Sequence, residues 1–217
     1  MRMNYQSRKY ALLNSDIEVD RHLRRINTFL MPGTKDRILE IGCGRGFLTR
    51  KVQRIAPATI GTDLNAQAVA NAVTSGLRVM DAQALDFSDA TFDKIYSFHA
   101  IEHIPNLAAA FAEMDRVLKP GGRVLLVYPA EPIRGLYVIP TAMILFGNPF
   151  RARDIHLHRL SPRALRPFLA GTSLCPVISQ LQLLLTPQFV TVLQKRAGVR
   201  HTPVVPGRLR RREVETV

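Results

Sequence analysis

Through the middle of the chain, short apolar runs alternate with segments in which apolar residues recur every three or four positions. Runs of this length suit buried strands, and the spacing between them is typical of amphipathic helices. The alternation predicts parallel βαβ units, and therefore an α/β fold with a doubly wound sheet. The expected strands are residues 37–41, 58–62, 77–80, 94–98 and 123–128, and the expected helices are residues 47–55, 66–74 and 107–118, with Pro120, Gly121 and Gly122 closing the last helix.

The two flanks of this alternation follow other patterns. Residues 1–34 show helical spacing until Pro32 and Gly33 break it, which predicts a helical cover. Behind Pro129 the rhythm changes, and an apolar and basic insertion occupies residues 133–160. We therefore expect a cover over 1–34, one domain over 35–196 that contains the insertion, and a basic tail over 197–217.

Beyond the insertion, the pattern predicts three more elements before the tail. A helix is expected over 161–169, with Ser161 as its N-cap and Pro162 at its first position. Two strands are expected over 176–184 and 189–193.

The first expected strand ends in three glycines, Gly42, Gly44 and Gly46, and a helical pattern follows them. Glycine lets the backbone turn sharply and lets a ligand approach more closely than a Cβ would permit. In a dinucleotide-binding loop the third glycine comes one residue later than it does here. The spacing therefore favours a ligand without a pyrophosphate, although the triplet by itself also suits a tight turn without a ligand.

Acidic residues follow the next two strands. Asp63 ends the second strand, where a carboxylate can accept hydrogen bonds from a ribose diol, and Asp81 follows the third, where it can face an adenine amine. Each could be a solvated loop acid on its own. Because the carboxyl ends of parallel strands meet at one edge of a sheet, the two acids and the glycine loop together predict a nucleoside cofactor site.

Five segments of the chain carry a family resemblance: ILEIGCGRG, IGTDLN, MDAQALDF, FDKIYSFHAIEHIPN and VLKPGGRVLL. In order and spacing they resemble the motifs of class I S-adenosylmethionine-dependent methyltransferases of the small-molecule type, over about residues 35–130. The resemblance implies a Rossmann-like, mostly parallel sheet with an antiparallel last strand, and S-adenosylmethionine as the cofactor. The cofactor-binding residues that it implies are Glu40, Gly42, Cys43, Gly44, Gly46, Asp63, Leu64, Asp81, Ala82 and His99.

The resemblance also implies a role for each part of this set. Glu40 and the glycines would surround the methionine part of the cofactor, and Asp63 would hold the ribose hydroxyls. Leu64 would pack on the adenine, and Asp81 with Ala82 would bind its amine and ring. His99 would lie near the transferred methyl group.

Candidate catalytic residues follow the fourth expected strand: His99, Glu102 and His103. A sulfonium methyl group is already activated, so the enzyme mainly has to align the acceptor, and a histidine can take the proton of a phenol or alcohol. The pair Glu102-His103 resembles the acceptor region of ubiquinone-biosynthesis O-methyltransferases. Alternatively, the two residues cap the helix that begins near Pro105.

Two further histidines, His156 and His158, flank Leu157. They could form a metal pair, face the acceptor, or have a surface role. We predict no metal site from the sequence.

Charge is distributed unevenly along the chain, whose net charge is +13. Residues 38–133 carry 9 Lys or Arg against 10 Asp or Glu, so the whole excess lies in the flanks. Basic flanks around a neutral core favour an anionic partner, either a membrane surface or nucleic acid, although solubility alone would also account for them.

A nucleic acid partner is disfavoured by three observations. The Asn/Asp-Pro-Pro-aromatic motif of amino-methylating DNA and RNA enzymes is absent from residues 97–100, which read Ser-Phe-His-Ala. Neither Cys43 nor Cys175 stands in a Pro-Cys pair that would suit base C5-methylation, and aromatic residues make up only 7% of the chain. Because of these observations, we keep an RNA-directed methyltransferase only as the alternative function.

A membrane surface agrees better with the insertion. Residues 136–146 are nearly all apolar and are bracketed by Arg134, Arg151 and Arg153. Such a segment is too short to cross a bilayer but can lie in its surface, and ubiquinone-type O-methyltransferases carry a membrane-contacting element at the same place. A lid over the acceptor or a dimer contact would also account for it.

From these observations we expect a small, hydrophobic or lipid-like acceptor of the quinone or lipid-precursor class. Two cysteines and the absence of a signal peptide pattern favour the cytoplasm, with peripheral binding at the inner face of the membrane. A non-catalytic cofactor-binding module and a nucleotide-dependent oxidoreductase remain as alternatives from other classes.

Overall fold

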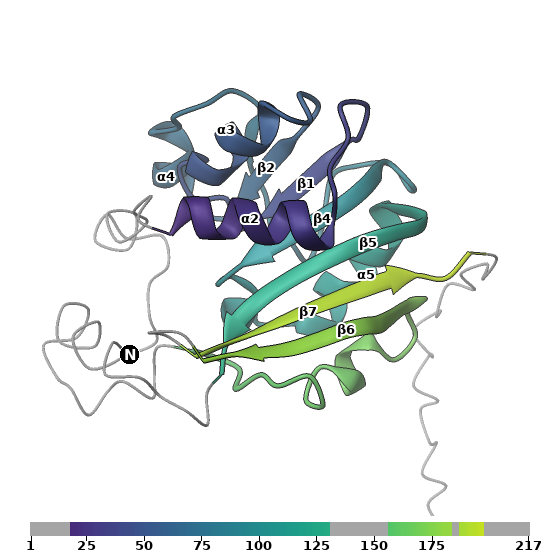
Figure 1. Cartoon of the computed structure of the whole chain (residues 1–217). Helices are drawn as coiled ribbons and strands as arrows, with labels where there is room; N and C mark the ends of the chain where they lie inside the picture. Colours follow the sequence, from purple (N-terminus) through teal and green to yellow (C-terminus); the bar gives the residue numbers. More distant parts are fainter. Residues whose placement is uncertain (1–17, 131–155, 184–186, 198–217) are drawn as a thin grey trace, which may run out of the picture.

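The computed structural model describes residues 18–130, 156–183 and 187–197 (Figure 1). The apolar segment 136–146, its flanking arginines and the basic tail lie outside the described residues, as do residues 1–17 of the expected cover.

A seven-stranded sheet forms the centre of the molecule, in the order β3-β2-β1-β4-β5-β7-β6. Its strands are β1 (Ile38–Ile41), β2 (Ile60–Asp63), β3 (Leu77–Val79), β4 (Phe92–Phe98), β5 (Leu118–Pro129), β6 (Leu174–Gln182) and β7 (Gln188–Lys195). Strands β1 to β5 pair in parallel, whereas β7 is antiparallel to both β5 and β6. The expected Rossmann-like fold with an antiparallel last strand is confirmed.

Helices cover both faces of the sheet, with α2 in front of it and α5 behind it in Figure 1. The α-helices are α2 (Val19–Phe29), α3 (Phe47–Gln53), α4 (Ala66–Ala70) and α5 (Leu107–Val117), and the 3-10 helices are η1 (Ile101–His103) and η3 (Arg166–Leu169). Alternate residues of β5 serve two separate cores: Val124 and Leu126 pack with the α5 side, and Leu125 and Val127 with the α2 and α3 side. This alternation follows from the period of two along a strand.

Helix α5 illustrates why the central segment folds as its pattern predicts. Its buried apolar residues repeat every three or four positions, so they form one stripe toward the sheet. Asn106 begins the helix, because its side chain accepts a hydrogen bond from the Ala109 amide at 3.1 Å.

The expected helix over 161–169 is wrong. Ser161 does accept a hydrogen bond from the Ala164 amide at 3.2 Å, but the chain continues as turns and then as η3. Pro167 lies inside the expected helix and has no amide to donate to the carbonyl four residues earlier, which explains the interruption.

Several other expected elements differ by a few residues at their ends, and contacts explain the difference in two of them. Helix α4 ends at Ala70 rather than at 74, because the chain turns away and the Val73 amide donates to the Arg45 carbonyl at 2.9 Å. Strand β5 begins at Leu118, which pairs with Phe92, so Gly121 and Gly122 lie within the strand instead of separating it from α5.

Candidate cofactor and acceptor site

The glycine loop at the end of β1 leaves no room for a side chain at Gly42 or Gly46. Gly42, Gly44 and Gly46 have φ values of +78°, +54° and +82°, in the left-handed region that favours glycine. A Cβ at Gly42 would collide with the Cβ of Ala100, and one at Gly46 would lie 2.6 Å from a methyl carbon of Leu77. The three glycines are therefore required by the backbone itself.

The loop is also fastened to the second strand. The amides of Gly42 and Cys43 both donate to the Thr62 carbonyl, at 2.8 and 3.0 Å. The Cys43 side chain is buried, and burial raises the pKa of its thiol. Cys43 is thus a neutral packing residue rather than a nucleophile.

Glu40 lies in β1, two residues before Gly42, and is only 4% exposed. It accepts hydrogen bonds from the Thr49 hydroxyl on α3 and from the Tyr96 hydroxyl on β4, the latter at 2.9 Å. Burial raises the pKa of Glu40 to about 8, although the bonds from Thr49 and Tyr96 act in the opposite direction. The group is therefore mostly protonated at neutral pH.

Asp63 stands at the end of β2 and reaches back to the loop. One carboxylate oxygen accepts from the Gly44 amide at 2.7 Å, and the other accepts from the Asn65 amide at 2.8 Å. Burial raises the pKa of Asp63, and these two amides lower it by less. The next residue, Leu64, leaves an apolar side chain 47% exposed beside this carboxylate.

The loop after β3 lies at the same edge of the sheet. The Met80 amide donates to the Asp63 carbonyl at 3.0 Å, which places Asp81 and Ala82 directly after this contact. Asp81 accepts from the amide of Gln83 at 2.8 Å, and the Gln83 side chain in turn accepts from the Asn106 amide at 2.9 Å. The structure thus brings the glycine loop and both predicted acids to one edge.

His99 follows β4 and has a φ of +51°, which is rare for a residue with a Cβ. Its Nδ1 lies 3.7 Å from Oε1 of Glu102 in η1. The same Glu102 oxygen lies 4.0 Å from Nε2 of His103, whose ring is 5.1 Å from that of His156 between centroids. The three predicted catalytic residues therefore form one cluster.

Glu102 is buried, and its two carboxylate oxygens have no hydrogen-bond partner. Burial raises its pKa and is the largest single influence, but His99, His103 and His156 together hold the pKa of Glu102 below its usual range. Glu102 is thus a buried anion among histidines. It does not cap the following helix, because Asn106 does.

The remaining histidine of the sequence analysis, His158, is held by contacts within the fold. His158 Nε2 lies 2.8 Å from the Ile104 carbonyl, and its ring packs edge-on against Phe168. His156 and His158 therefore do not act as a pair.

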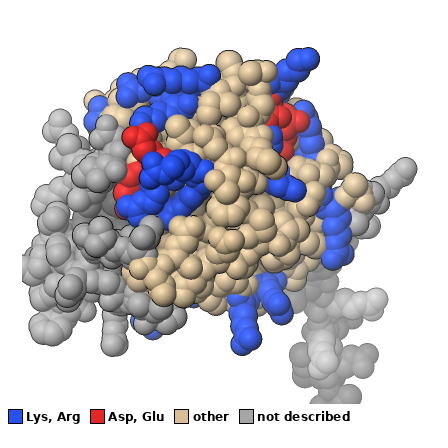
Figure 2. All heavy atoms as spheres, viewed as in Figure 1, with Lys and Arg blue, Asp and Glu red and all other residues tan. Residues whose placement is uncertain are grey.

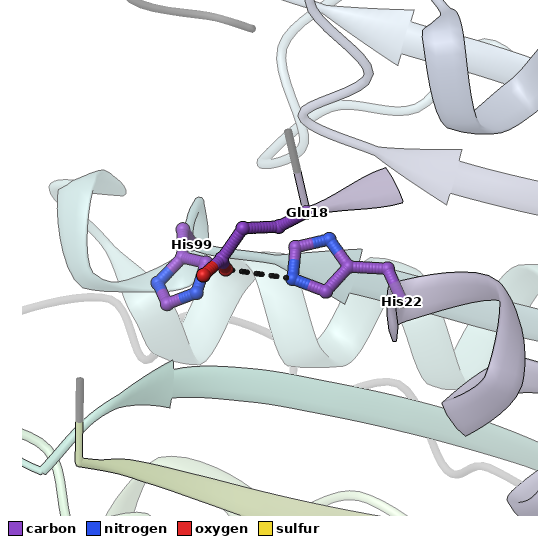
Figure 3. Close-up of side chains that lie close together, drawn as sticks. All are labelled: Glu18, His22 and His99. Carbon is purple, nitrogen blue, oxygen red and sulfur yellow. Dashed lines mark ion pairs between the residues drawn. The ribbon is translucent and has the colours of Figure 1, made fainter. Parts of the chain in front are cut away.

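The sequence analysis missed two polar residues that face His99: Glu18, the N-cap of α2, and His22 in its first turns (Figure 3). Glu18 Oε2 lies 3.4 Å from His22 Nε2, and the His22 ring stacks on Phe98 with 4.3 Å between centroids. The close approach of the His22 ring nitrogen is the main reason why the pKa of Glu18 is lowered to about 2, and the charge of Arg21 acts in the same direction. The only sequence signal was their spacing of four residues on a helix, which is common on surfaces.

Comparison with known proteins identifies the family. Residues 39–126 match the family model described as a methyltransferase domain. Residues 39–126 thus form a methyltransferase domain of the class I S-adenosylmethionine-dependent kind. These residues include the glycine loop, Asp63, Asp81 and the three predicted catalytic residues.

Relatives of the methyltransferase domain act on different acceptors, according to their names. The chain is 26% identical over 211 residues to malonyl-[acyl-carrier protein] O-methyltransferase of Erwinia pyrifoliae, which covers 93% of this chain and 78% of the relative. It is 33% identical over 98 residues to ubiquinone biosynthesis O-methyltransferase of Nitrosococcus oceani, which covers 41% of each chain. Against most of the curated relatives that it matches, the chain spans less than half of their length.

A solved structure has the same fold as the methyltransferase domain. Geranyl diphosphate C-methyltransferase from Streptomyces coelicolor, in complex with Mg²⁺, geranyl-S-thiolodiphosphate and S-adenosyl-L-homocysteine, superposes with a TM-score of 0.62. The sequence identity is 13%, over 81% of this chain and 76% of that chain. This likeness shows the fold alone.

The geometry of the loop predicts that Gly42→Ala is far more destabilising than Gly171→Ala. Both positions have φ near +80°, but a Cβ at Gly171 would meet no atom within 4 Å. Gly171→Ala should lower the free energy of unfolding by about 1–2 kcal/mol through backbone strain. Gly42→Ala should lower it by about 1–3 kcal/mol more, because the collision with Ala100 is added. Urea unfolding measures both, and equal losses would contradict the close approach at Gly42.

Proposed function

We propose that the methyltransferase domain moves the methyl group of S-adenosylmethionine to a small, hydrophobic or lipid-like acceptor. One observation carries this proposal: the glycine loop, Asp63 and the loop after β3 meet at the sheet edge at which the His99–Glu102 pair also stands. The binding elements of a nucleoside and a candidate base are thus contributed by neighbouring strand ends.

The residues at this edge have free capacity for the cofactor. A carboxylate can accept about four hydrogen bonds, and Asp63 uses two of these positions for backbone amides, so two are left for a ribose diol. The exposed side chain of Leu64 offers an apolar face to an adenine ring, with Asp81 and Ala82 beside it for the amine and the ring edge. Glu40 and the glycines would then lie against the methionine part.

Loss of the Asp63 carboxylate should weaken binding of S-adenosylhomocysteine by at least about 100-fold, because two hydrogen bonds to a charged group contribute about 1.5–3 kcal/mol each. Calorimetry with Asp63→Ala measures this. The matched control is Asp86→Ala, which removes an exposed carboxylate six residues from Met80 in sequence and should leave affinity unchanged. Wild-type affinity in Asp63→Ala would refute the role of Asp63.

For the acceptor, the cluster offers a base and a group that orients it. A buried anionic Glu102 can accept the Nδ1 proton of His99, which leaves the other ring nitrogen to take a proton from an acceptor hydroxyl. His103 lies against the same carboxylate and would help to keep it ionised. Alignment of the acceptor with the methyl group would supply most of the acceleration.

The class of acceptor rests on the sequence of the flanks and on the names of the relatives, which include quinone and sterol methyltransferases. We propose an anionic membrane surface as the partner from which a lipid-like acceptor is taken, at the cytoplasmic side, with residues 133–160 as lid or membrane contact. Figure 2 shows several groups of Lys and Arg around a broad uncharged area on one face. Among the helices of the described residues, none is long and apolar enough to cross a membrane.

Turnover of labelled S-adenosylmethionine with an extract of cellular lipids and quinones tests the reaction and isolates its acceptor. Glu102→Gln, which keeps the shape of the side chain but removes its charge, should lower the rate by about 100- to 10,000-fold if His99 is a base that Glu102 orients. Affinity for S-adenosylhomocysteine should stay at the wild-type value. Absence of any labelled product from the wild type would favour the non-catalytic module. Label transferred to RNA instead, in a parallel assay with cellular RNA, would favour the RNA-directed alternative.

A further inference from the structure

Three side chains of the kind that bind metals meet where α2 passes the end of β4 (Figure 3). Glu18 and His22 are four residues apart at the start of α2, so they lie on one side of the helix. His99 directly follows β4. One potential ligand atom of each of the three residues lies within 4.8 Å of those of the other two.

The distance within this group suits metal ligands better than a hydrogen bond. Glu18 Oε2 and His22 Nε2 are 3.4 Å apart, whereas a charge-assisted N–H···O bond is about 2.7–2.9 Å long. Ligands placed about 2.1 Å from a tetrahedral ion are about 3.4 Å from one another. His22 Nε2 is buried and has no hydrogen-bond partner, so it faces the carboxylate without being satisfied by it.

Surrounding groups hold these side chains in place. Arg21 donates to the other oxygen of Glu18 at 2.7 Å, and Phe98 stacks on the His22 ring. Glu102 lies beside His99 and has two buried oxygens without a hydrogen-bond partner. Histidines that bind metals usually donate their second ring nitrogen to such a carboxylate, which fixes the orientation of the ring.

We infer that Glu18, His22 and His99 form a binding site for one divalent transition-metal ion of the Zn²⁺ type. Two imidazoles and one carboxylate are a common ligand set for zinc and leave a fourth position open. The ion would join α2 to the end of β4. It would also occupy a ring nitrogen of His99, so His99 could not accept a proton while the ion is bound.

This inference differs from our expectation from the sequence, which predicted no metal site. It also goes beyond methyl transfer, because the site requires neither the cofactor nor an acceptor. A second group, Glu102, His103 and His156, also brings three potential ligand atoms within 4.8 Å of one another. In this group His103 Nε2 lies 4.0 Å from the carboxylate, farther than His22 lies from Glu18, and Glu102 is already placed to orient His99.

Co²⁺ binding to the full chain, treated with a chelator and dialysed, tests the site. We expect one ion per chain, with the visible absorption of tetrahedral Co²⁺, and displacement of Co²⁺ by Zn²⁺. Glu18→Gln and His22→Ala should each weaken binding by more than about 100-fold, since even the loss of a group behind a ligand weakens metal binding about 10- to 100-fold. Circular dichroism and S-adenosylhomocysteine affinity identify variants that are folded.

His103→Ala and His156→Ala are the matched controls, because they remove histidines of the second group only. Both should bind Co²⁺ with wild-type affinity. Loss of binding in these two variants, with retention in His22→Ala, would place the ion in the second group and overturn the inference. Absence of the tetrahedral Co²⁺ absorption in the wild type would overturn it as well, and would leave the proposed methyl transfer untouched.

Discussion

The hydrogen bonding of the buried Glu40 carboxyl group is the interaction on which the candidate cofactor site at the edge of the sheet depends. Glu40 belongs to β1, two residues before Gly42, and its carboxyl group joins this strand to α3 through Thr49 and to β4 through Tyr96. A charge in this position would be costly, and the raised pKa shows that the protein keeps the group mostly neutral. Because its pKa in the folded protein is about 8 instead of 4.5, Glu40 contributes stability below pH 4.5 that is lost as the pH rises through about 8.

The rest of the site follows from this fixed platform. The amides of Gly42 and Cys43 hold the loop to β2, and the Gly44 amide donates to Asp63. The loop backbone lies so close to Ala100 and Leu77 that only glycine fits at positions 42 and 46. The same platform includes β4, whose end carries His99 in an unusual backbone conformation. Binding groups and the candidate base thus share one rigid support, which is what the alignment of a cofactor with an acceptor requires.

The sequence predicted the parts of the molecule that local patterns determine. The glycine loop, the strand periodicity and the acids at the strand ends can be recognised in the sequence, because each of these features depends on residues that are close together in the chain. The helix expected over 161–169 was wrong because Pro167 outweighs a favourable start at Ser161. Strand β5 begins early because Leu118 pairs with Phe92, a contact that no local pattern reveals.

Glu18 and His22 show that sequence patterns have the same limit at the candidate site. Glu18 and His22 look like an ordinary helical ion pair, and only the packing of α2 against Phe98 brings them to His99. Likewise, nothing in the spacing of Glu102, His103 and His156 shows that Glu102 is buried among histidines. Such clusters join elements that are distant in sequence, so they become visible only when the fold is known.

The central claim is that a cationic sulfonium cofactor binds on the glycine loop above a protonated Glu40. Proton release on binding tests it most directly, by calorimetry at about pH 7 in buffers of different ionisation enthalpy. The positive charge of S-adenosylmethionine should lower the pKa of Glu40 from about 8, so the wild type should release a substantial fraction of a proton, and more than S-adenosylhomocysteine induces. Glu40→Gln should bind without this release. Equal proton release by the wild type and Glu40→Gln, or no binding of S-adenosylmethionine at all, would contradict the account.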